Sequence, residues 1–595
     1  MGNYKLWAAF ALATLVFYFI PLFDSQTSIQ GDAVDIHYSA QKYFADSVRQ
    51  GHLPQWTPYL FSGFPFLADP KTGAWYPLHW PFFLAGITPR AIEWELALHA
   101  FLALCGAYLL ARRMSVDHAG SLVAAVFYAG GGYFAGHSAH VGMFETAALL
   151  PWLLWSALRA AEGGSILLAG AIGGFIVLIG DYRGALFCLG ALAVLMLARR
   201  APGKLAITAI VAVLLGAIQV LPALELASQS GHAATGAALK PAAFLSLVLP
   251  NFYGSNYDLP DSYQFYLYGG ILLVPLAIVG SFKKRIWLLL FVFFGIQAWF
   301  VVALGLALAA GTGAAWIAER FRKPWLVYAV LMLSAADLWY WNMGDNTLAY
   351  LSSSFAEKYG DPFASFESHL APVKQRPLAR IWSPFDSSAF GPLNGSLDGR
   401  TEVTYGYNAL ELARYQEYMH AAEQNPNLLN GLAVTHGIDT QRAAIVENTR
   451  ALPRIYAPPQ VKFVATHAAA LALLPSLDPG QWAVVETALR PLAPGPTAVE
   501  ILDYRGDFYR AKYSAPFDCL LRIAVPYYPG WTAAIDGKST AVYAVDGALS
   551  GVFAPAGDHE LTFRYRSNWF VGGAAISALT LIGIILSSTL FASRR

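Results

Sequence analysis

Long apolar runs, separated by polar segments, recur through the first 342 positions of the chain. Each run is roughly 16–22 residues long, about the length of an α-helix that crosses a bilayer. The pattern therefore predicts a polytopic α-helical membrane protein with about twelve transmembrane helices. They are expected near residues 5–23, 92–111, 119–135, 143–160, 165–180, 184–198, 204–224, 264–281, 286–301, 303–318, 324–342 and 568–591.

The positively charged residues favour this count, because Lys and Arg are retained on the cytoplasmic side of membrane proteins. With twelve spans, Lys5 and five basic clusters all fall on one side. The clusters are Arg112-Arg113, Arg199-Arg200 with Lys204, Lys283 to Arg285, Arg320 to Lys323, and Arg594-Arg595. The segment 286–318 is long for one helix and short for two, and the charge pattern favours a tight hairpin there.

The same pattern divides the chain into a membrane module and an extracytoplasmic domain. Residues 1–342 form the membrane module, and residues 24–91 form its first extracytoplasmic loop. Residues 343–495 mix helical and strand patterns and predict an α/β region. Residues 496–567 alternate apolar and polar positions, which predicts a β-sandwich of about six strands or more. Asp536-Gly537 predicts a tight turn between two of these strands. Residues 568–595 return to the membrane as the last helix.

Composition agrees with a membrane protein and excludes other classes. Hydrophobic residues make up 56% of the chain and charged residues 13%, whereas soluble domains are about a quarter charged. The net charge of +1 gives no sign of nucleic-acid binding. Cys105, Cys188 and Cys519 are far apart, so neither a disulfide framework nor a zinc-ligand spacing is present. The first apolar run lacks a small-residue cleavage site after it, which indicates a retained span.

The first loop contains a series of spaced motifs. They are Gly31-Asp32, GHLPQWTPY (51–59), FSGFPF (61–66), ADPKTG (68–73) and WYP (75–77). Further segments of the same kind are GHSAHVGMFETAALLPWLLW (136–155), LPALELASQS (221–230), YLYGGILLVPLA (266–277), YYPGWTAAIDGK (527–538) and PAGDHELTFRYRSNWFVGG (555–573). Over nearly its whole length the chain resembles the bacterial YfhO membrane proteins. It departs from them in a shortened region between Lys283 and Pro324, and in Arg183, where the family more often has Gln.

The resemblance implies a GT-C-type glycosyltransferase, a hexosyl- or pentosyltransferase in the bacterial inner membrane. Such enzymes take a sugar from a polyprenyl-phosphate carrier and transfer it to a glycan or glycolipid acceptor at the extracytoplasmic face. They place a catalytic Asp or Glu in the first extracytoplasmic loop. The expected partners are therefore the lipid-linked donor, the acceptor and membrane lipids. No cofactor is expected; a divalent metal is possible but not favoured.

Asp32 and Asp35 are the candidate catalytic residues. Sugar transfer needs a carboxylate that accepts or orients the proton of the acceptor hydroxyl. If residues 31–49 form a helix at the membrane surface, the two carboxylates share one face. Asp32 also follows a glycine at the expected helix start, so it could instead cap the helix. Asp35 could equally orient the substrate or serve the structure.

Asp69, Lys71 and Tyr76 are candidate contacts to the acceptor or to the phosphate. Asp-Pro and Thr-Gly in the same segment equally indicate a turn. The aromatic side chains of the loop could stack on sugars or form a belt at the membrane interface. These are Trp56, Tyr59, Trp75 and Tyr76.

His137, His140 and Glu145 follow the third predicted span. The histidines could bind the phosphate, move a proton, or be satisfied within the structure. A metal site formed by the two histidines and Glu145 is conceivable, but the spacing matches no known ligand pattern.

Asp181 and Arg183 lie between two short apolar runs. Charged side chains are costly inside a bilayer, so both are expected at its surface or in a polar cavity. Arg183 is expected to bind the phosphate, unless the two residues pair with each other and close a helical hairpin. Glu225, at the end of the seventh predicted span, could face the same cavity or cap its helix.

Two other functions remain open. A transporter or flippase of lipid-linked sugars predicts buried charges and broken helices midway through the spans. A non-catalytic envelope scaffold predicts no polar cavity under the first loop. The ionisable groups gather at one face of the membrane, which favours the enzyme. The sandwich has no nucleophile or metal pattern and is assigned to acceptor presentation or support.

Overall fold

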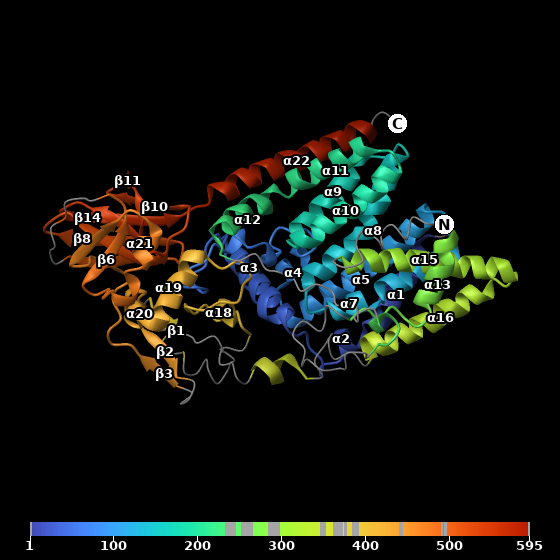
Figure 1. Cartoon of the computed structure of the whole chain (residues 1–595), viewed down its shortest axis with the longest axis horizontal. Helices are drawn as coiled ribbons and strands as arrows, with labels where there is room; N and C mark the ends of the chain where they lie inside the picture. The colour runs from blue at the N-terminus through green and yellow to red at the C-terminus, as the bar shows by residue number, and fades with distance from the viewer. Residues whose placement is uncertain are drawn as a thin grey trace.

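The computed structural model of the chain describes residues 3–231, 245–250, 266–283, 298–344, 353–360, 370, 373, 376, 378–382, 392–439, 444–488, 492 and 497–592. A body of helices lies beside a β-rich domain, and the last helix runs from that domain back along the helical body (Figure 1). The fold class is therefore confirmed in outline: a helical N-terminal region is followed by a β-rich C-terminal domain.

Four of the described helices are long and apolar enough to cross a membrane. They are α5 (Pro89–Arg113), α8 (Val141–Ala161), α15 (Trp299–Phe321) and the segment Asn568–Ser587 of α22 (Asn568–Ala592). A bent pair, α11 (Pro202–Leu215) and α12 (Ala217–Gln229), makes a fifth if it is counted as one span. The expected number of twelve is not confirmed.

Shorter helices occupy most of the other expected positions. They are α1 (Asn3–Phe17), α6 (His118–Ala129), α9 (Ile166–Ile179), α10 (Tyr182–Ala198), α13 (Leu273–Lys283) and α16 (Trp325–Trp339). Helices of this length rise by 1.5 Å per residue and reach about 17–26 Å, less than the bilayer core of about 30 Å. Length alone therefore does not identify them as spans.

Two predicted spans have a different shape. Helix α15 continues without interruption where a turn between residues 301 and 303 was expected, so that boundary is wrong. Most of the first arm of the expected hairpin, residues 286–297, lies outside the described residues. The span expected at 204–224 breaks at Gly216 into α11 and α12, which are bent by 76°. The Ile218 N–H exposed by this break donates to Ser577 Oγ of α22 over 2.9 Å.

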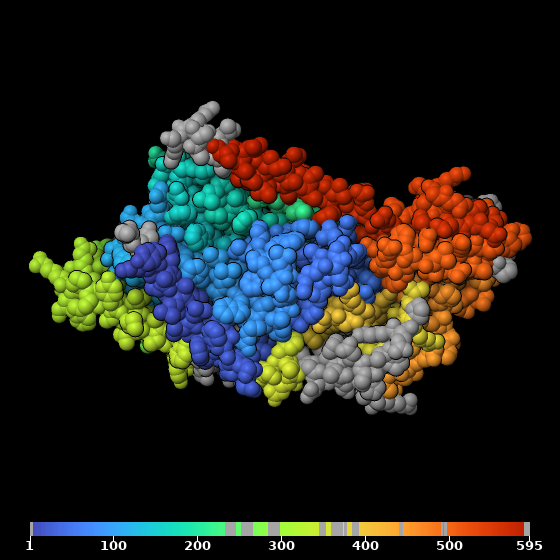
Figure 2. Space-filling view, turned by 180° about the vertical axis from the view of Figure 1, so that it is seen from behind, coloured from blue at the N-terminus to red at the C-terminus, as the bar shows by residue number. Residues whose placement is uncertain are grey.

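The first loop is folded rather than extended. It follows α2 (Phe19–Phe23) and contains a π-helical turn η1 (Ala33–Tyr38), α3 (Ser39–Arg49), the 3-10 turns η2 (Phe66–Ala68) and η3 (Pro70–Thr72), and α4 (Trp80–Ala85). The helix expected over residues 31–49 is therefore present as η1 followed by α3. Seen from behind, this N-terminal region, in blue, meets the β-rich domain, in orange (Figure 2).

Aromatic side chains attach the first loop to the C-terminal domain. Trp56 is buried, and its ring centroid lies 5.2 Å from that of Trp531 and 4.9 Å from that of Tyr565. Trp75 stacks on Phe570 at the start of α22, with centroids 5.5 Å apart. Trp56 therefore neither stacks on a sugar nor faces the membrane interface, because the sandwich covers its ring.

Within the residues that the structure describes, the β-rich domain contains three sheets. The smallest joins β1 (Ile381–Trp382), β2 (His436–Asp439) and β3 (Ala444–Glu447) in the order β1-β2-β3. Short helices accompany it: α18 (Gly395–Asp398), α19 (Ala413–Gln424), α20 (Asn427–Gly431), α21 (His467–Leu471) and the 3-10 turn η9 (Leu474–Ser476). Around β1 and β2 a small separate core forms from Leu370, Val373, Ile381, Val403 and Ile438.

The other two sheets form the sandwich. One has the order β11-β10-β14-β8-β7, and the other has the order β4-β9-β13-β12-β6-β5. The strands are β4 (Ile455–Tyr456), β5 (Gln460–Val464), β6 (Trp482–Glu486), β7 (Ala498–Tyr504), β8 (Phe508–Ala515), β9 (Cys519–Pro526), β10 (Trp531–Ile535), β11 (Lys538–Thr540), β12 (Val542–Val545), β13 (Leu549–Ala554) and β14 (Gly557–Tyr565). Because β4, β5 and β6 precede residue 496, the sandwich begins earlier than the expected boundary.

The sequence pattern explains the sandwich locally. Strand β8 alternates buried and exposed side chains along most of its length, as its period-two pattern predicts. The predicted turn at Asp536-Gly537 joins β10 to β11, and both residues have positive φ angles, of 48° and 76°. This is the conformation that two-residue hairpin turns require.

Candidate active site

Asp32 lies immediately before η1, with its carboxylate half-buried. It makes no capping hydrogen bond to the helix, so the structure does not support the capping interpretation. Its Oδ1 instead accepts a hydrogen bond from the Tyr407 hydroxyl over 3.3 Å. Its Oδ2 lies 3.7 Å from His140 Nε2. Three segments, the first loop, the start of α8 and the C-terminal domain, therefore meet at this carboxylate.

Asp35 faces the C-terminal domain. Its Oδ1 accepts a hydrogen bond from the Leu393 backbone N–H over 2.8 Å. Burial raises the pKa of Asp35 to about 6, with a further contribution from the nearby Asp32 charge. The Leu393 hydrogen bond and Lys358 act in the opposite direction. This carboxylate thus holds the domain in position, which agrees with the structural alternative.

Asp69 is part of a turn, as the Asp-Pro dipeptide indicates. Its Oδ1 accepts from the Lys71 backbone N–H over 2.9 Å, which caps η3. Its Oδ2 accepts from Asn408 Nδ2 of the C-terminal domain over 2.6 Å. Asp69 is buried and both of its oxygens are engaged, so its contacts are those of a structural residue.

The Lys71 ammonium group is a positive charge that acts on several of these residues. Its positive charge helps to lower the pKa of His37 and of His140, and it acts on Asp181 as well. The side chain of Lys71 therefore lies among residues from the first loop, the start of α8 and the start of α10. A phosphate bound in this region would be attracted by the Lys71 ammonium group.

His137 and His140 lie between α7 (Gly132–Gly136) and α8. His137 Nδ1 lies 2.9 Å from the Tyr133 carbonyl oxygen, and its ring stacks on Tyr133 with centroids 4.1 Å apart. Burial lowers the pKa of His137 to about 3, and burial with the Lys71 charge lowers that of His140 to about 4. Both rings are therefore neutral near pH 7. His137 has the contacts of a structural residue, whereas His140 lies beside Asp32.

Asp181 and Arg183 occupy the turn between α9 and α10. Asp181 caps α10, and its Oδ1 accepts from the Gly184 N–H over 3.0 Å. Arg183 is exposed, lies over the Phe187 ring at 5.9 Å, and forms no ion pair with Asp181 or any other described residue. The predicted alternative of a direct Asp181–Arg183 pair is therefore absent here. The Arg183 guanidinium remains available to an anion.

The α9–α10 turn contacts the first loop directly. Gly180 has a φ of 93°, and a Cβ atom there would lie 2.0 Å from the Pro70 carbonyl oxygen. Only glycine fits this approach. The motif that contains Arg183 thus packs against the motif that contains Asp69 and Lys71.

An apolar groove of about 440 Å³ begins beside this turn. It is lined by residues of α9 to α12, and Tyr182 and Leu410 are among them. Arg183 follows Tyr182 directly in the chain. Glu225, on α12, points elsewhere: it interacts with the Ser567 side chain before α22, and its charge helps to raise the pKa of Tyr528 and of Tyr565. It neither caps its helix nor contributes to the group around Asp32.

Tyr76 and Glu145 belong to a second, fully buried cluster. His79 Nε2 lies 2.7 Å from Glu145 Oε1 and 3.8 Å from Glu95 Oε2. The Tyr76 hydroxyl lies 2.8 Å from His99 Nε2. Burial alone would lower the pKa of His79, but Glu145 and Glu95 outweigh it and raise the pKa to about 9. The Glu145 carboxylate therefore faces His79 and α5 rather than His137 and His140. The metal site considered for His137, His140 and Glu145 is not formed.

Sequence reasoning missed His79, Glu95 and His99. A signal was present, because Glu95 and His99 are ionisable, lie four residues apart, and interrupt the apolar helix α5. Ionisable residues inside a membrane-spanning segment mark a functional or structural site by default. Tyr407, the hydrogen-bond partner of Asp32, gave no such signal, because its position depends on the folding of the C-terminal domain.

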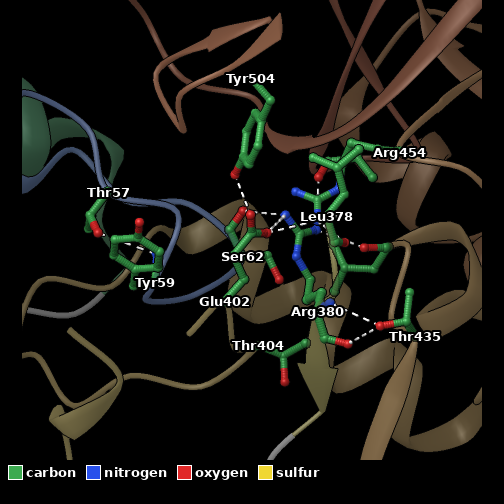
Figure 3. A network of polar contacts seen from close by, with 12 residues as sticks. Thr57, Tyr59, Ser62, Leu378, Arg380, Glu402, Thr404, Thr435, Arg454 and Tyr504 are labelled. Carbon is green, nitrogen blue, oxygen red and sulfur yellow. Dashed lines mark hydrogen bonds and ion pairs between the residues drawn. The ribbon is translucent and has the colours of Figure 1, made fainter. Parts of the chain in front are cut away.

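A buried ionic network fixes the C-terminal domain to the first loop (Figure 3). Arg380 Nη2 donates to the Ser62 carbonyl oxygen over 3.1 Å and to Glu402 Oε2 over 3.3 Å. Arg454 Nη2 lies 2.8 Å from the same carboxylate oxygen, and the Tyr504 hydroxyl donates to the other. The network joins the first loop, the small sheet and both sheets of the sandwich at one point.

Comparison with known proteins agrees with part of this picture. Residues 497–577 match the family model described as bacterial membrane protein YfhO. The resemblance is confirmed. It is confirmed for this C-terminal stretch, which covers the end of the sandwich and the start of α22. No curated protein matches the chain.

Solved structures share the overall fold. A cryo-EM structure of a mutant of the mycobacterial arabinofuranosyltransferase AftD has a TM-score of 0.51 at 11% identity, over 95% of this chain and 60% of that one. Another structure of AftD gives 0.49 at 12% identity, over 95% and 57%. ArnT from Cupriavidus metallidurans bound to undecaprenyl phosphate gives 0.42 at 15% identity, over 80% and 96%. The chain spans less than two thirds of AftD, and at this identity the likeness shows the fold alone.

Proposed function

We propose that this protein is a membrane glycosyltransferase. It transfers a sugar from a polyprenyl-phosphate-linked donor to a cell-envelope polymer or glycolipid at the extracytoplasmic face. The observation that carries the proposal is the position of Asp32. Its carboxylate is free of any capping role, lies beside His140, and is covered by Tyr407 of the C-terminal domain.

The residues around Asp32 supply the chemistry that such a transfer needs. Asp32 accepts or orients the proton of the acceptor hydroxyl as the new glycosidic bond forms. Lys71 and Arg183 stabilise the negative charge on the departing phosphate. Because Arg183 follows Tyr182 at the edge of the apolar groove, a lipid chain in the groove brings its phosphate close to the guanidinium. AftD, which shares the fold, is named as an arabinofuranosyltransferase.

Transport of a lipid-linked sugar is the second candidate, and two observations favour it. Helices α5 and α8 contain the buried residues Glu95, His99 and Glu145, and α11 and α12 form a broken helix. However, Glu145 lies in the second turn of α8 and Glu95 in the second turn of α5. These are the helix ends nearest the first loop rather than the middle of a span. We therefore favour the enzyme.

Purified full-length protein in lipid vesicles distinguishes the two. It is incubated with a panel of polyprenyl-phosphate sugars, each carrying a radiolabelled sugar, and with a glycan acceptor. The proposal expects the label of one donor to move to the acceptor. Label that crosses the vesicle membrane while still attached to its lipid, with no transfer, would instead support the transporter.

A further inference from the structure

The buried cluster below the first loop brings together three potential metal ligands. His79 comes from the loop just before α4, Glu95 from α5 and Glu145 from α8. One ligand atom from each lies within 4.8 Å of the others. All three side chains are at most 2% exposed. Segments far apart in the sequence thus converge on one small volume.

The two buried carboxylates require positive charge nearby, which either a proton on His79 or a bound metal cation can provide. Two carboxylates and an imidazole lie together away from solvent, where an uncompensated charge is strongly unfavourable. His99 adds no further ligand, since its Nδ1 lies 2.7 Å from the Glu95 carbonyl oxygen and its Nε2 lies 2.8 Å from the Tyr76 hydroxyl. A divalent cation with two carboxylates and a neutral imidazole gives a neutral site.

The surrounding groups hold the ligands in an orientation suited to a metal. His79 Nδ1 donates to the Gly73 carbonyl oxygen over 3.0 Å, which directs Nε2 toward the two carboxylates. Metal-binding histidines commonly use their second nitrogen in this way. A Cβ atom at Gly73 would lie 2.7 Å from the His79 ring, so the glycine permits this contact. Gln41 Nε2 donates to Glu95 Oε2 over 3.2 Å and orients that carboxylate.

Two carboxylate oxygens in the cluster lack partners among the described residues. They are Glu95 Oε1 and Glu145 Oε2, and both are fully buried. A buried acceptor without a partner is unfavourable by roughly 1–3 kcal/mol, and more if it is charged. A cation bound between the carboxylates would satisfy both oxygens and take the place of the proton now shared between His79 and Glu145.

We propose that His79 Nε2 and the carboxylates of Glu95 and Glu145 bind one divalent transition-metal ion. One nitrogen and carboxylate oxygens form a donor set suited to Zn²⁺ or Mn²⁺. The ion joins the first loop to α5 and α8 and so fixes the support on which Asp32 rests. This site differs from the one considered for His137, His140 and Glu145, and it does not depend on the proposed sugar transfer.

Metal binding by the full-length protein tests the proposal directly. The protein is purified in detergent, stripped with a chelator, and titrated with Zn²⁺ and separately with Mn²⁺. Wild type is expected to bind one ion per chain, and Glu95→Gln and Glu145→Gln are expected to bind at least tenfold more weakly. Glu93→Gln is the matched control, because Glu93 is a buried carboxylate on the same helix that instead pairs with Arg90 at 2.6 Å. It is expected to bind like wild type.

A second measurement does not depend on the folding of any variant. X-ray absorption at the zinc edge of the loaded wild-type protein is expected to report nitrogen and oxygen ligands, with scattering from one imidazole. Wild type that binds neither ion, or that binds both no more tightly than Glu95→Gln, would overturn the proposal. So would a bound zinc that has sulfur ligands or no imidazole.

Discussion

At the scale of single residues, the candidates separate by what each side chain touches. The Asp32 carboxylate does not cap its helix, and the Arg183 guanidinium forms no ion pair with a described residue. Asp35, Asp69 and Asp181 each accept a backbone hydrogen bond, which gives them a local structural role. Short polar side chains in turns serve both purposes equally well, so the sequence alone could not distinguish them.

Asp35 should make stability depend on pH. Its folded pKa of about 6 lies above the ordinary value of 3.8, so the folded state binds the proton more tightly. The resulting stabilisation is complete below about pH 4 and is lost as the pH rises through about 6. Asp35→Asn is therefore expected to raise the free energy of unfolding at pH 8 by up to about 3 kcal/mol, and to have little effect at pH 4.

The measurement is chemical unfolding of both proteins in detergent at several pH values. The Asn side-chain oxygen can still accept the Leu393 hydrogen bond, so the comparison isolates the charge. An equal difference between the two proteins at pH 4 and pH 8 would contradict this account.

Arg183 should act on donor binding. A charged hydrogen bond to phosphate contributes about 1.5–3 kcal/mol, so Arg183→Ala is expected to raise the KM for the donor by roughly 10- to 100-fold. Arg183→Lys should recover part of this loss, because it keeps the charge but not the paired donors. Arg200→Ala, an exposed arginine beyond the other end of α10, serves as the control. Steady-state kinetics with varied donor concentration provide the test, and an unchanged KM in Arg183→Ala would remove the phosphate-binding role.

At the scale of secondary-structure elements, local patterns predicted more than long-range contacts. The period-two alternation in β8 and the turn at Asp536-Gly537 are properties of adjacent residues, and both predictions are confirmed. Strand β6 joins the sandwich by antiparallel pairing with β12, a distant segment, and β5 pairs with β6 in parallel. Such long-range pairing leaves no local signature in the sequence. The burial of Trp56 depends in the same way on strands more than 450 residues later.

Membrane spans show the same limit. Hydropathy located most helices but did not predict their lengths or the bend at Gly216. That break is stabilised by Ser577 of α22, a residue that no local window includes. The buried cluster was not predicted, because the mean hydropathy of α5 stays high despite Glu95 and His99. Their pairing with His79 required the fold of the first loop.

The ionic network of the C-terminal domain should be essential to its attachment. Glu402 is buried and compensates two arginines, Arg380 and Arg454. Removing one partner of a buried ion pair costs about 3–5 kcal/mol, because the remaining charge is left without compensation. Glu402→Gln is expected to lower the free energy of unfolding by that amount.

Glu447→Gln is the matched control for this change. Glu447 pairs with Arg376 at 2.6 Å, but both side chains are exposed. Exposed ion pairs contribute little to stability, so this variant should unfold like wild type. Thermal unfolding of the two variants in detergent gives the comparison. Equal losses in both would show that burial of the network has no special effect.

At the scale of the whole molecule, the proposed catalytic group Asp32 lies between the helical body and the C-terminal domain. The first loop contacts α5, α8 and the start of α10 on one side and the C-terminal domain on the other. In the proposed function, the lipid chain of the donor occupies the apolar groove. This arrangement suits an enzyme whose donor is embedded in the membrane and whose acceptor lies outside it.

The orientation of the chain in the membrane can be tested with thiol labelling. Cys105, Cys188 and Cys519 are buried, so an introduced exposed cysteine dominates the reaction with a membrane-impermeant reagent. Lys538→Cys, in the sandwich, is expected to react in bacterial cells whose outer membrane alone has been permeabilised. Arg200→Cys, between α10 and α11, should react only after the inner membrane is opened. The reverse pattern would place the C-terminal domain in the cytoplasm and contradict the proposed function.

The proposed function depends on the Asp32 carboxylate as the group that accepts or orients the acceptor proton. The most direct measurement is the transfer rate of Asp32→Asn beside that of Asp24→Asn, an exposed carboxylate of the same loop. Both are assayed in lipid vesicles with the donor that wild type uses, after equal unfolding temperatures have been verified. Loss of a general base or orienting carboxylate predicts a rate about 10²- to 10⁴-fold below wild type for Asp32→Asn, and a wild-type rate for Asp24→Asn. A wild-type rate in Asp32→Asn would contradict the account.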